Sequence, residues 1–292
     1  MIYDVRHVTS YTYETPVSSA ICTLRLTPRE GFGQRVLDSG IEIAPFPVSR
    51  RTRLDFFGNA VDFVTIEDAH RELRVASLSR VEVHREPQPL AELTPAWEDV
   101  RLQSSMYRGL DRRSPAHEIF PTRLAPIHGP ITEYATQSFA PGRPILSAAI
   151  ELMKRIHADF RYDPKATLIS TPIAEAFEAR GGVCQDFAHI MIAGLRGLGL
   201  PACYVSGYIR TTPPEGQPRL EGADASHAWV RAWCGEGIGW LGLDPTNGLQ
   251  VNDDFVEVAV GRDYSDVAPL DGIILISGKQ TLKVNVDVKP VG

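Results

Sequence analysis

Residues 179–191 read Ala179-Arg180-Gly181-Gly182-Val183-Cys184-Gln185-Asp186-Phe187-Ala188-His189-Ile190-Met191. From the cysteine onward, apolar residues recur at helical spacing: Phe187, Ile190, Met191, Leu195 and Leu198. The pattern predicts a buried helix that opens at Cys184, directly after a loop with two glycines. Glycines at this point let the backbone approach a substrate closely.

The predicted position of Cys184 favours a reactive thiol. Free N–H groups and the positive dipole at a helix N-terminus favour a thiolate over a thiol, and the thiolate is the nucleophile. A free cysteine is also often just a small buried hydrophobe. From this stretch alone both interpretations stay open.

Composition indicates a globular chain. The 292 residues, 43% of them hydrophobic, suffice for about two domains. A formal net charge of −6 provides no broad basic field, so nucleic acid is not an expected partner. No apolar run of about 18 residues and no charged-then-apolar leader is present, so we expect a cytoplasmic protein that does not bind a membrane. The cysteines are scattered, which argues against a disulfide framework and a structural zinc site: Cys22, Cys184, Cys203 and Cys234.

Residues 1–90 read as an all-β domain. Short runs rich in β-branched and aromatic residues are separated by Gly, Asn and Pro, which is typical of a sandwich or barrel. The expected strands cover residues 2–13, 20–28, 36–44, 51–57, 60–66 and 73–86. Three histidines here show no spacing for metal ligation, and we assign them no chemistry: His7, His70 and His84.

Residues 91–144 form a proline-rich connecting region, with helical pieces expected only near 97–107 and 131–136. Residues 145–292 form the expected second domain. Its predicted elements are helices at 145–160 and 172–179, the Cys184 helix, a buried strand at 202–209 and a polar exposed loop at 212–218.

His227 and Asp244 lie on two predicted strands, 226–234 and 240–246, joined by a short turn. A two-residue turn at Gly235-Glu236 would place His227 directly opposite Asp244. A loop from Gly235 to Ile238 would shift the pairing by two residues and make them near-diagonal neighbours, still within reach. A carboxylate beside an imidazole fixes its tautomer, as the general base of a triad requires. A surface His–Asp hydrogen bond is the alternative.

Three motifs together resemble the core of the transglutaminase-like superfamily of papain-type Cys-His-Asp enzymes. They are the Gly-Gly-Val-Cys184-Gln-Asp-Phe-Ala-His helix start, Ser-His227-Ala-Trp-Val, and Trp-Leu-Gly-Leu-Asp244-Pro-Thr-Asn. The match runs from about Ile145 to Arg262. The resemblance implies an α+β, papain-like core in which the cysteine helix packs on an antiparallel sheet or barrel. The region before this match more loosely resembles the β-rich N-terminal domain that precedes such cores in bacterial proteins.

The resemblance implies a covalent thioester mechanism with no metal and no cofactor. Cys184 would attack a carboxamide carbonyl, His227 would carry the proton to the leaving group, and Asp244 would orient His227. The backbone N–H of Cys184 is the first candidate for the oxyanion hole. Tyr162 and Gln185 are weaker candidates for a second donor, and structural packing is an equal explanation for Tyr162.

Three classes of function are compatible with these residues. The first is a thiol hydrolase acting on peptide or protein amides, and the second is a cross-linking transglutaminase that transfers glutamine acyl groups to amines. The third is a non-catalytic binding module, which is disfavoured because all three catalytic residue types are present. We favour hydrolysis because no calcium loop of the D-x-[DN]-x-[DN]-G kind occurs in the sequence.

Two further residues of the Cys184 helix are not expected to take part in catalysis. Asp186 is expected to hold the helix start in place, and His189, five residues beyond Cys184, is expected to pack away from the thiol.

Overall fold

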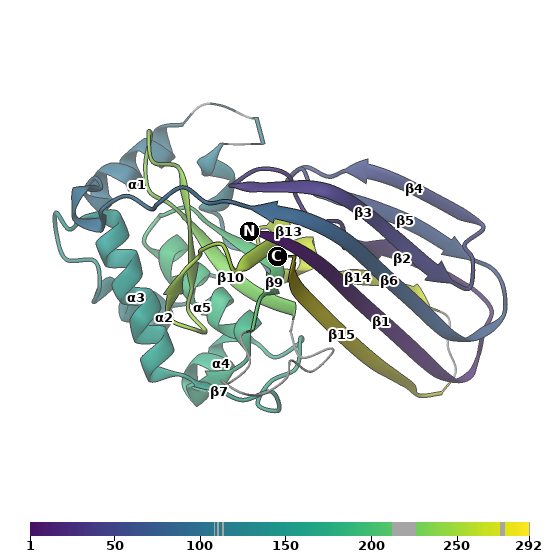
Figure 1. Cartoon of the computed structure of the whole chain (residues 1–292). Coiled ribbons are helices and arrows are strands. Elements are labelled where there is room, and N and C mark those ends of the chain that lie inside the picture. Colours follow the sequence, from purple (N-terminus) through teal and green to yellow (C-terminus); the bar gives the residue numbers. More distant parts are fainter. Residues whose placement is uncertain (108, 110, 113, 212–225, 275–277, 292) are drawn as a thin grey trace, which may run out of the picture.

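The described residues form three antiparallel sheets, a short parallel pair of strands and a group of helices (Figure 1). The computed structural model describes residues 1–107, 109, 111–112, 114–211, 226–274 and 278–291. The predicted loop at 212–218 lies outside these residues.

The N-terminal part of the chain is a two-sheet sandwich, as the all-β prediction expected. Its own strands are β1 Ile2–Val17, β2 Ala20–Leu24, β3 Gln34–Ala44, β4 Ser49–Leu54, β5 Ala60–Ile66 and β6 His70–Val83. One sheet has the order β15-β1-β6-β3 and the other β14-β2-β5-β4. Alternate residues of these strands face inward because successive side chains of a strand point to opposite faces, and they form an apolar interior that includes Leu24, Ile66 and Val75.

The last two strands of the chain return to this sandwich. β14 (Leu270–Ile274) pairs with β2, and β15 (Gln280–Val291) pairs with β1 from Ile2↔Val291 to Tyr13↔Gln280. The ends of the chain therefore lie side by side (Figure 1). The sequence-based division groups residues 145–292 together, whereas the last two strands of that range complete the N-terminal sheets.

The second part of the fold is a five-stranded sheet packed against helices. The sheet has the order β12-β11-β10-β9-β13. Its strands are β9 Ala202–Ile209, β10 Ser226–Trp233, β11 Trp240–Asp244, β12 Leu249–Gln250 and β13 Phe255–Gly261. The helices of this part and of the connecting region are α1 Trp97–Met106, α2 Gly129–Thr136, α3 Ile145–Asp159, α4 Ile173–Ala179, α5 Cys184–Gly197 and α6 Tyr264–Val267. Two short 3-10 turns lie at Ala91–Leu93 and Pro115–Glu118.

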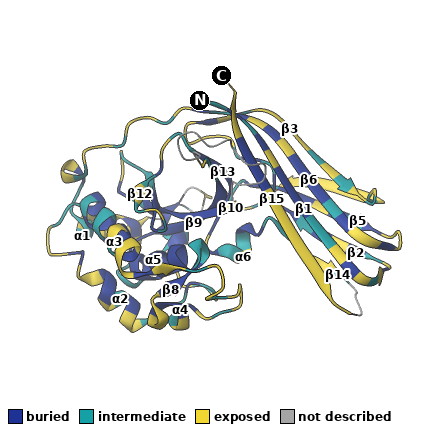
Figure 2. Cartoon of the chain, turned by 60° about the horizontal axis from the view of Figure 1, so that its bottom comes forward, coloured by how far each residue is buried: buried dark blue, intermediate teal, exposed yellow. Residues whose placement is uncertain are grey.

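Helix α5 is the centre of this second part. It is buried along most of its length (Figure 2). Met191 and Leu195 of α5 belong to one apolar core with Ala228 and Val230 of β10. The predicted α+β arrangement, with the cysteine helix on an antiparallel sheet, is confirmed.

The two parts of the molecule share buried apolar contacts. The long strands β1, β6 and β15 extend beyond the sandwich, where Val5 and Val288 pack with Tyr208 and Val256 of the second sheet. Burying an aliphatic side chain of this size contributes about 1.5–3 kcal/mol. This contact gives the second sheet a fixed position on the sandwich.

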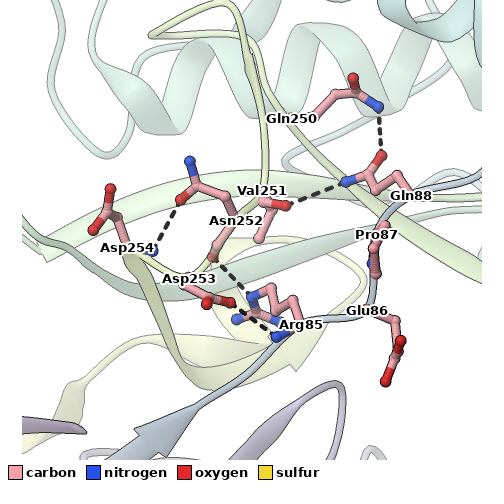
Figure 3. Close-up of a pocket in the computed structure, with 9 residues that line it drawn as sticks. All are labelled: Arg85, Glu86, Pro87, Gln88, Gln250, Val251, Asn252, Asp253 and Asp254. Atoms are coloured by element: carbon pink, nitrogen blue, oxygen red, sulfur yellow. Dashed lines mark hydrogen bonds between the residues drawn. The ribbon is translucent and has the colours of Figure 1, made fainter. Parts of the chain in front are cut away.

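Hydrogen bonds from Arg85, just after β6, also connect the two parts of the molecule (Figure 3). Its backbone N–H donates to Asp253 Oδ1 at 2.8 Å, and its Nε donates to the carbonyl of Asn252 at 2.9 Å. Gln88 donates to the carbonyl of Val251 at 3.2 Å. These bonds hold the loop between β12 and β13, and β12 pairs with Asp244.

The turn between β10 and β11 follows the longer of the two predicted loops. Val230 pairs with Leu243 and Trp233 with Trp240, so His227 and Asp244 are offset by two residues. Positive φ angles at Gly235, Gly237 and Gly239 explain this outcome, because glycine adopts them without steric cost. The structure contains no described helix long and apolar enough to cross a membrane.

Candidate active site

Helix α5 begins at Cys184 because its first turn is capped from within. Asp186, in that turn, accepts the backbone N–H of Val183 at 2.8 Å through Oδ2. This carboxylate satisfies one of the N–H groups that a helix start leaves open and complements the positive end of the helix dipole. Cys184 itself is half-buried, so its thiol lies at the surface of the core at the helix N-terminus.

The two glycines before Cys184 pair with the segment that carries Tyr162. Gly181 and Gly182 form β8, which runs parallel to β7 (Arg161–Tyr162), with Tyr162 level with Gly182. Asp163 extends this pairing by donating its N–H to the carbonyl of Gly182 at 2.9 Å. Partial burial and the charge of Cys184 raise the pKa of Tyr162. The structure therefore brings Tyr162 beside the thiol, with its side chain still 53% exposed.

His227 and Asp244 meet as diagonal neighbours across β10 and β11. Nε2 of His227 lies 2.8 Å from Oδ2 of Asp244, and Asp244 is fully buried. A carboxylate can only accept, so Nε2 carries a proton and Nδ1 is the nitrogen left for the thiol. The thiol of Cys184 is in hydrogen-bond contact with His227.

Asp244 accepts hydrogen bonds on both of its carboxylate oxygens. Oδ1 accepts the backbone N–H groups of Thr246 at 2.9 Å and Asn247 at 3.3 Å. Oδ2 accepts the side-chain N–H of Asn247 at 2.7 Å besides the imidazole. With four donors around it, this carboxylate keeps its orientation and cannot turn away from His227.

The imidazole of His227 favours its charged form. Burial lowers its pKa, but the hydrogen bonds with Asp244 and Cys184 and the charges of both outweigh burial and raise the pKa of His227 to about 10. A protonated imidazole between a carboxylate and a thiolate is the arrangement that an activated cysteine nucleophile needs.

Two aromatic rings fix the plane of His227. Trp229 lies 6.1 Å away and Phe255 6.3 Å away between ring centroids, and the two rings contact each other edge to face. Gly207, which faces His227 in the register, makes room for them. A Cβ at Gly207 would come within 2.5 Å of the Trp229 ring and 2.1 Å of the carbonyl oxygen of Val256.

The two remaining residues considered from the sequence, Gln185 and His189, lie in different environments. Gln185 lines a cavity together with Arg123 and Ile173, and its role as an oxyanion donor stays a prediction. His189 points into the protein, where Nε2 accepts the N–H of Tyr264 at 3.2 Å, and burial lowers the pKa of His189 to about 4.

Sequence reasoning missed two residues that support Asp244. Asn247 donates to the carboxylate, as described above, and His157 of α3 hydrogen-bonds the carbonyl of Thr246 through Nδ1 at 2.7 Å. Asn247 could have been found, because Asn in the turn after Asp-Pro is a local hydrogen-bonding residue. His157 could not, since nothing in the sequence places α3 beside this turn.

The other three cysteines are buried in apolar surroundings. Burial raises the pKa of Cys22 to about 11 and that of Cys234 to about 12, and it also raises the pKa of Cys203. Among the four thiols, Cys184 alone combines partial exposure with a neighbouring imidazole.

Comparison with known proteins places this geometry in context. Residues 3–82 match the model of the bacterial transglutaminase-like N-terminal region, and residues 132–245 match that of the transglutaminase-like superfamily. An uncharacterised protein of Mycobacterium tuberculosis is 40% identical over 99% of this chain and 92% of its own length. A protein-glutamine gamma-glutamyltransferase of Pseudomonas aeruginosa is 32% identical over 44% of this chain and 23% of its own length.

Among solved structures, a protein from Cytophaga hutchinsonii described as a candidate cysteine protease has a similar fold. The TM-score is 0.75 at 19% identity, with 100% of this chain and 92% of the other covered. At this identity the likeness concerns the fold.

Proposed function

The chain belongs to the transglutaminase-like superfamily, and on that premise we propose that it is a thiol-dependent acyl-transfer enzyme with Cys184, His227 and Asp244 as its catalytic triad. Its substrates are peptide or glutamine-type amides, and water is the favoured acceptor of the acyl group. The observation that carries the proposal is the position of His227 between the thiol of Cys184 and the buried carboxylate of Asp244.

In the first half-reaction the Cys184 thiolate attacks the carbonyl carbon of the amide. The carbonyl electrons move to oxygen, and the tetrahedral anion then collapses as protonated His227 gives its proton to the leaving amine or ammonia. Forming the thioester removes the negative charge that stabilises the imidazolium. The pKa of His227 therefore falls during this step, which favours release of the proton.

In the second half-reaction neutral His227 takes a proton from water as the water attacks the thioester. The carboxylic acid leaves and the thiolate and imidazolium are restored. Asp244 keeps His227 oriented throughout, because four donors hold its carboxylate in place.

The oxyanion would be stabilised by the backbone N–H of Cys184, which stands at the open end of α5. Tyr162 is our candidate for the second donor, since its strand pairs with Gly182. The Tyr162 side chain is half-exposed in the free protein. Its hydroxyl would therefore stabilise the anion only after bound substrate has ordered the side chain against the site.

Exposure supports water as the acceptor. Cys184 is half-buried and Tyr162 half-exposed, so the described walls of the site do not separate a thioester from water. Amine transfer is the second candidate, and the similarity to a protein-glutamine gamma-glutamyltransferase over part of the chain is the observation in its favour.

The test is to trap the acyl-enzyme from a library of glutaminyl peptides and peptide amides and to read the attached mass. Free peptide of the sequence identified in this way is then incubated with fresh enzyme, once in water alone and once with hydroxylamine added. We expect the adduct on Cys184 and release of the free acid in water. No adduct, or an adduct on another cysteine, would contradict the triad, and acyl transfer to the amine without measurable hydrolysis would favour the second candidate.

A further inference from the structure

We propose that Asp186 is a positioning residue that holds the Cys184 turn and the segment 162–171 in one arrangement, and that the bond from Thr167 to Asp186 sets the position of this segment for substrate. The proposal rests on the proposed role of Cys184 as the nucleophile. It adds one function to Asp186, which otherwise only begins a helix.

A single carboxylate oxygen makes both connections. Oδ2 of Asp186 accepts the N–H of Val183 at 2.8 Å and the hydroxyl of Thr167 at 2.6 Å. Asp186 is only 4% exposed, so both bonds end on a buried residue and are stronger than bonds between fully exposed groups. Helix capping needs the first bond alone, and Thr167 lies in the preceding segment, outside the helix.

The absence of a side chain at Gly182 leaves room for Oδ2 of Asp186. A Cβ on Gly182 would come within 2.5 Å of Oδ2 of Asp186 and within 2.9 Å of its Cβ. Gly182 is also the residue that pairs with Tyr162. Only glycine at this position allows the carboxylate, the Tyr162 strand and the Cys184 turn to lie together.

The segment that Thr167 anchors presents apolar side chains to solvent. Leu168 is 74% exposed and Ile169 is 60% exposed, and both follow Thr167 directly. One end of the segment is fixed by the Asp163–Gly182 hydrogen bond. Since Tyr162 lies beside Cys184, a peptide on the thiol would meet this segment, and apolar side chains there suit contact with a substrate.

Separate bonds should have separate kinetic effects. Thr167→Val removes the bond to the segment but leaves the bond to Val183, so substrate binding should weaken while the nucleophile stays in place. Asp186→Ala removes both bonds, so the turn that carries Cys184 should also lose its orientation. Misplacement of a reacting group by about 1 Å costs about 100-fold in rate.

The experiment measures KM, kcat and the rate of Cys184 alkylation by iodoacetamide in the full chain. The substrate is the peptide that acylates Cys184 in the trapping assay, and kcat is normalised to titratable thiol. For Thr167→Val we expect KM to rise about 5- to 10-fold with kcat and alkylation within about twofold. Thr167→Ser should restore KM, and Thr136→Val, which removes an exposed hydroxyl on α2, should change nothing.

For Asp186→Ala and Gly182→Ala we expect kcat to fall about 10- to 100-fold and alkylation to slow. Should Asp186→Ala not fold, Gly182→Ala and Thr167→Val still decide. The proposal is overturned if Thr167→Val leaves KM unchanged, if Thr167→Ser does not restore it, or if Gly182→Ala leaves kcat and alkylation unchanged. If no peptide is turned over, the proposed function fails, and the alkylation rates still report whether Asp186 positions Cys184.

Discussion

At the scale of single residues, the site depends on how Asp244 and His227 divide their work. Asp244→Asn keeps the shape but places an N–H₂ group where Oδ2 accepts from His227 and Asn247. The donors would then face each other, and His227 would have to adopt the other tautomer. We expect turnover to fall about 10²- to 10⁴-fold with the fold retained.

His227→Ala should abolish turnover and also slow alkylation, because the thiolate loses its ion-pair partner. The double variant should cost about as much as His227→Ala alone, since residues that act as one unit give non-additive losses. Turnover of the single and double variants checks this, with circular dichroism for folding and exposed Asp38→Asn as the matched control. Additive losses, or normal turnover of Asp244→Asn, would show that another carboxylate supports the base.

The raised pKa of His227 also predicts how stability depends on pH. The pKa is about 10 in the folded protein against an ordinary value of 6.5, so the folded state binds the proton more tightly. The stabilisation is fully present below pH 6.5 and is lost as pH rises toward 10.

The measurement is the free energy of unfolding of the protein and of His227→Gln between pH 6 and 10. The difference between the two should shrink as pH rises, by about 1.4 kcal/mol for each unit of pKa shift. A difference that grows or stays constant would contradict the assigned charge state.

At the scale of elements, the position of the His227 imidazole depends on the close pairing of β10 with β9 at Gly207. Gly207→Ala would press a methyl group against the Trp229 ring and the carbonyl of Val256. We expect a loss of about 1–3 kcal/mol in the free energy of unfolding, as for overpacked cores, together with lower turnover. Gly40→Ala is the control, because a Cβ there meets nothing within 4 Å. Equal stability of the two variants in urea unfolding would mean that β10 does not depend on this close approach.

Much of the site could be predicted from the sequence at this scale. The Cys184 helix start, its glycine loop and the two strands carrying His227 and Asp244 all follow local periodicity, which the sequence contains directly. The hairpin register left two solutions, because it depends on how many of Gly235, Gly237 and Gly239 adopt positive φ. The Thr167–Asp186 bond was beyond prediction, since no local pattern tells where a loop folds back.

At the scale of the whole molecule, the sandwich and the five-stranded sheet should unfold together. Val288 of β15 is fully buried where β15 contacts Tyr208 and Val256 of the second sheet. We expect Val288→Ala to cost about 1–3 kcal/mol. Val284→Ala on the same strand, where the side chain is 45% exposed, should cost much less.

Tryptophan fluorescence makes this coupling visible. The four tryptophans, Trp97, Trp229, Trp233 and Trp240, all lie outside the sandwich strands. If Val288→Ala lowers the fluorescence midpoint in step with circular dichroism, the two parts form one cooperative unit. A shift in circular dichroism alone would mean that the sandwich unfolds independently.

The destination of β14 and β15 could not be predicted from the sequence. Alternation identifies a strand but does not name its partner, and these strands follow β13 and α6 along the chain. Their pairing with β2 and β1 depends on long-range packing, in which Val286 and Val288 of β15 pack with Tyr208 and Val256 of the five-stranded sheet.

The pairing of β1 with β15 bears on how the protein is made in the cell. A ribosome releases β15 only after β1 and the whole five-stranded sheet have emerged. Until then β1 keeps an open edge, which is a template for misassembly with other chains. Contacts this distant in sequence also form slowly. The nascent chain thus carries Cys184 well before β15 covers the open edge of β1, and chaperones that shield an open strand edge would raise the yield of folded protein.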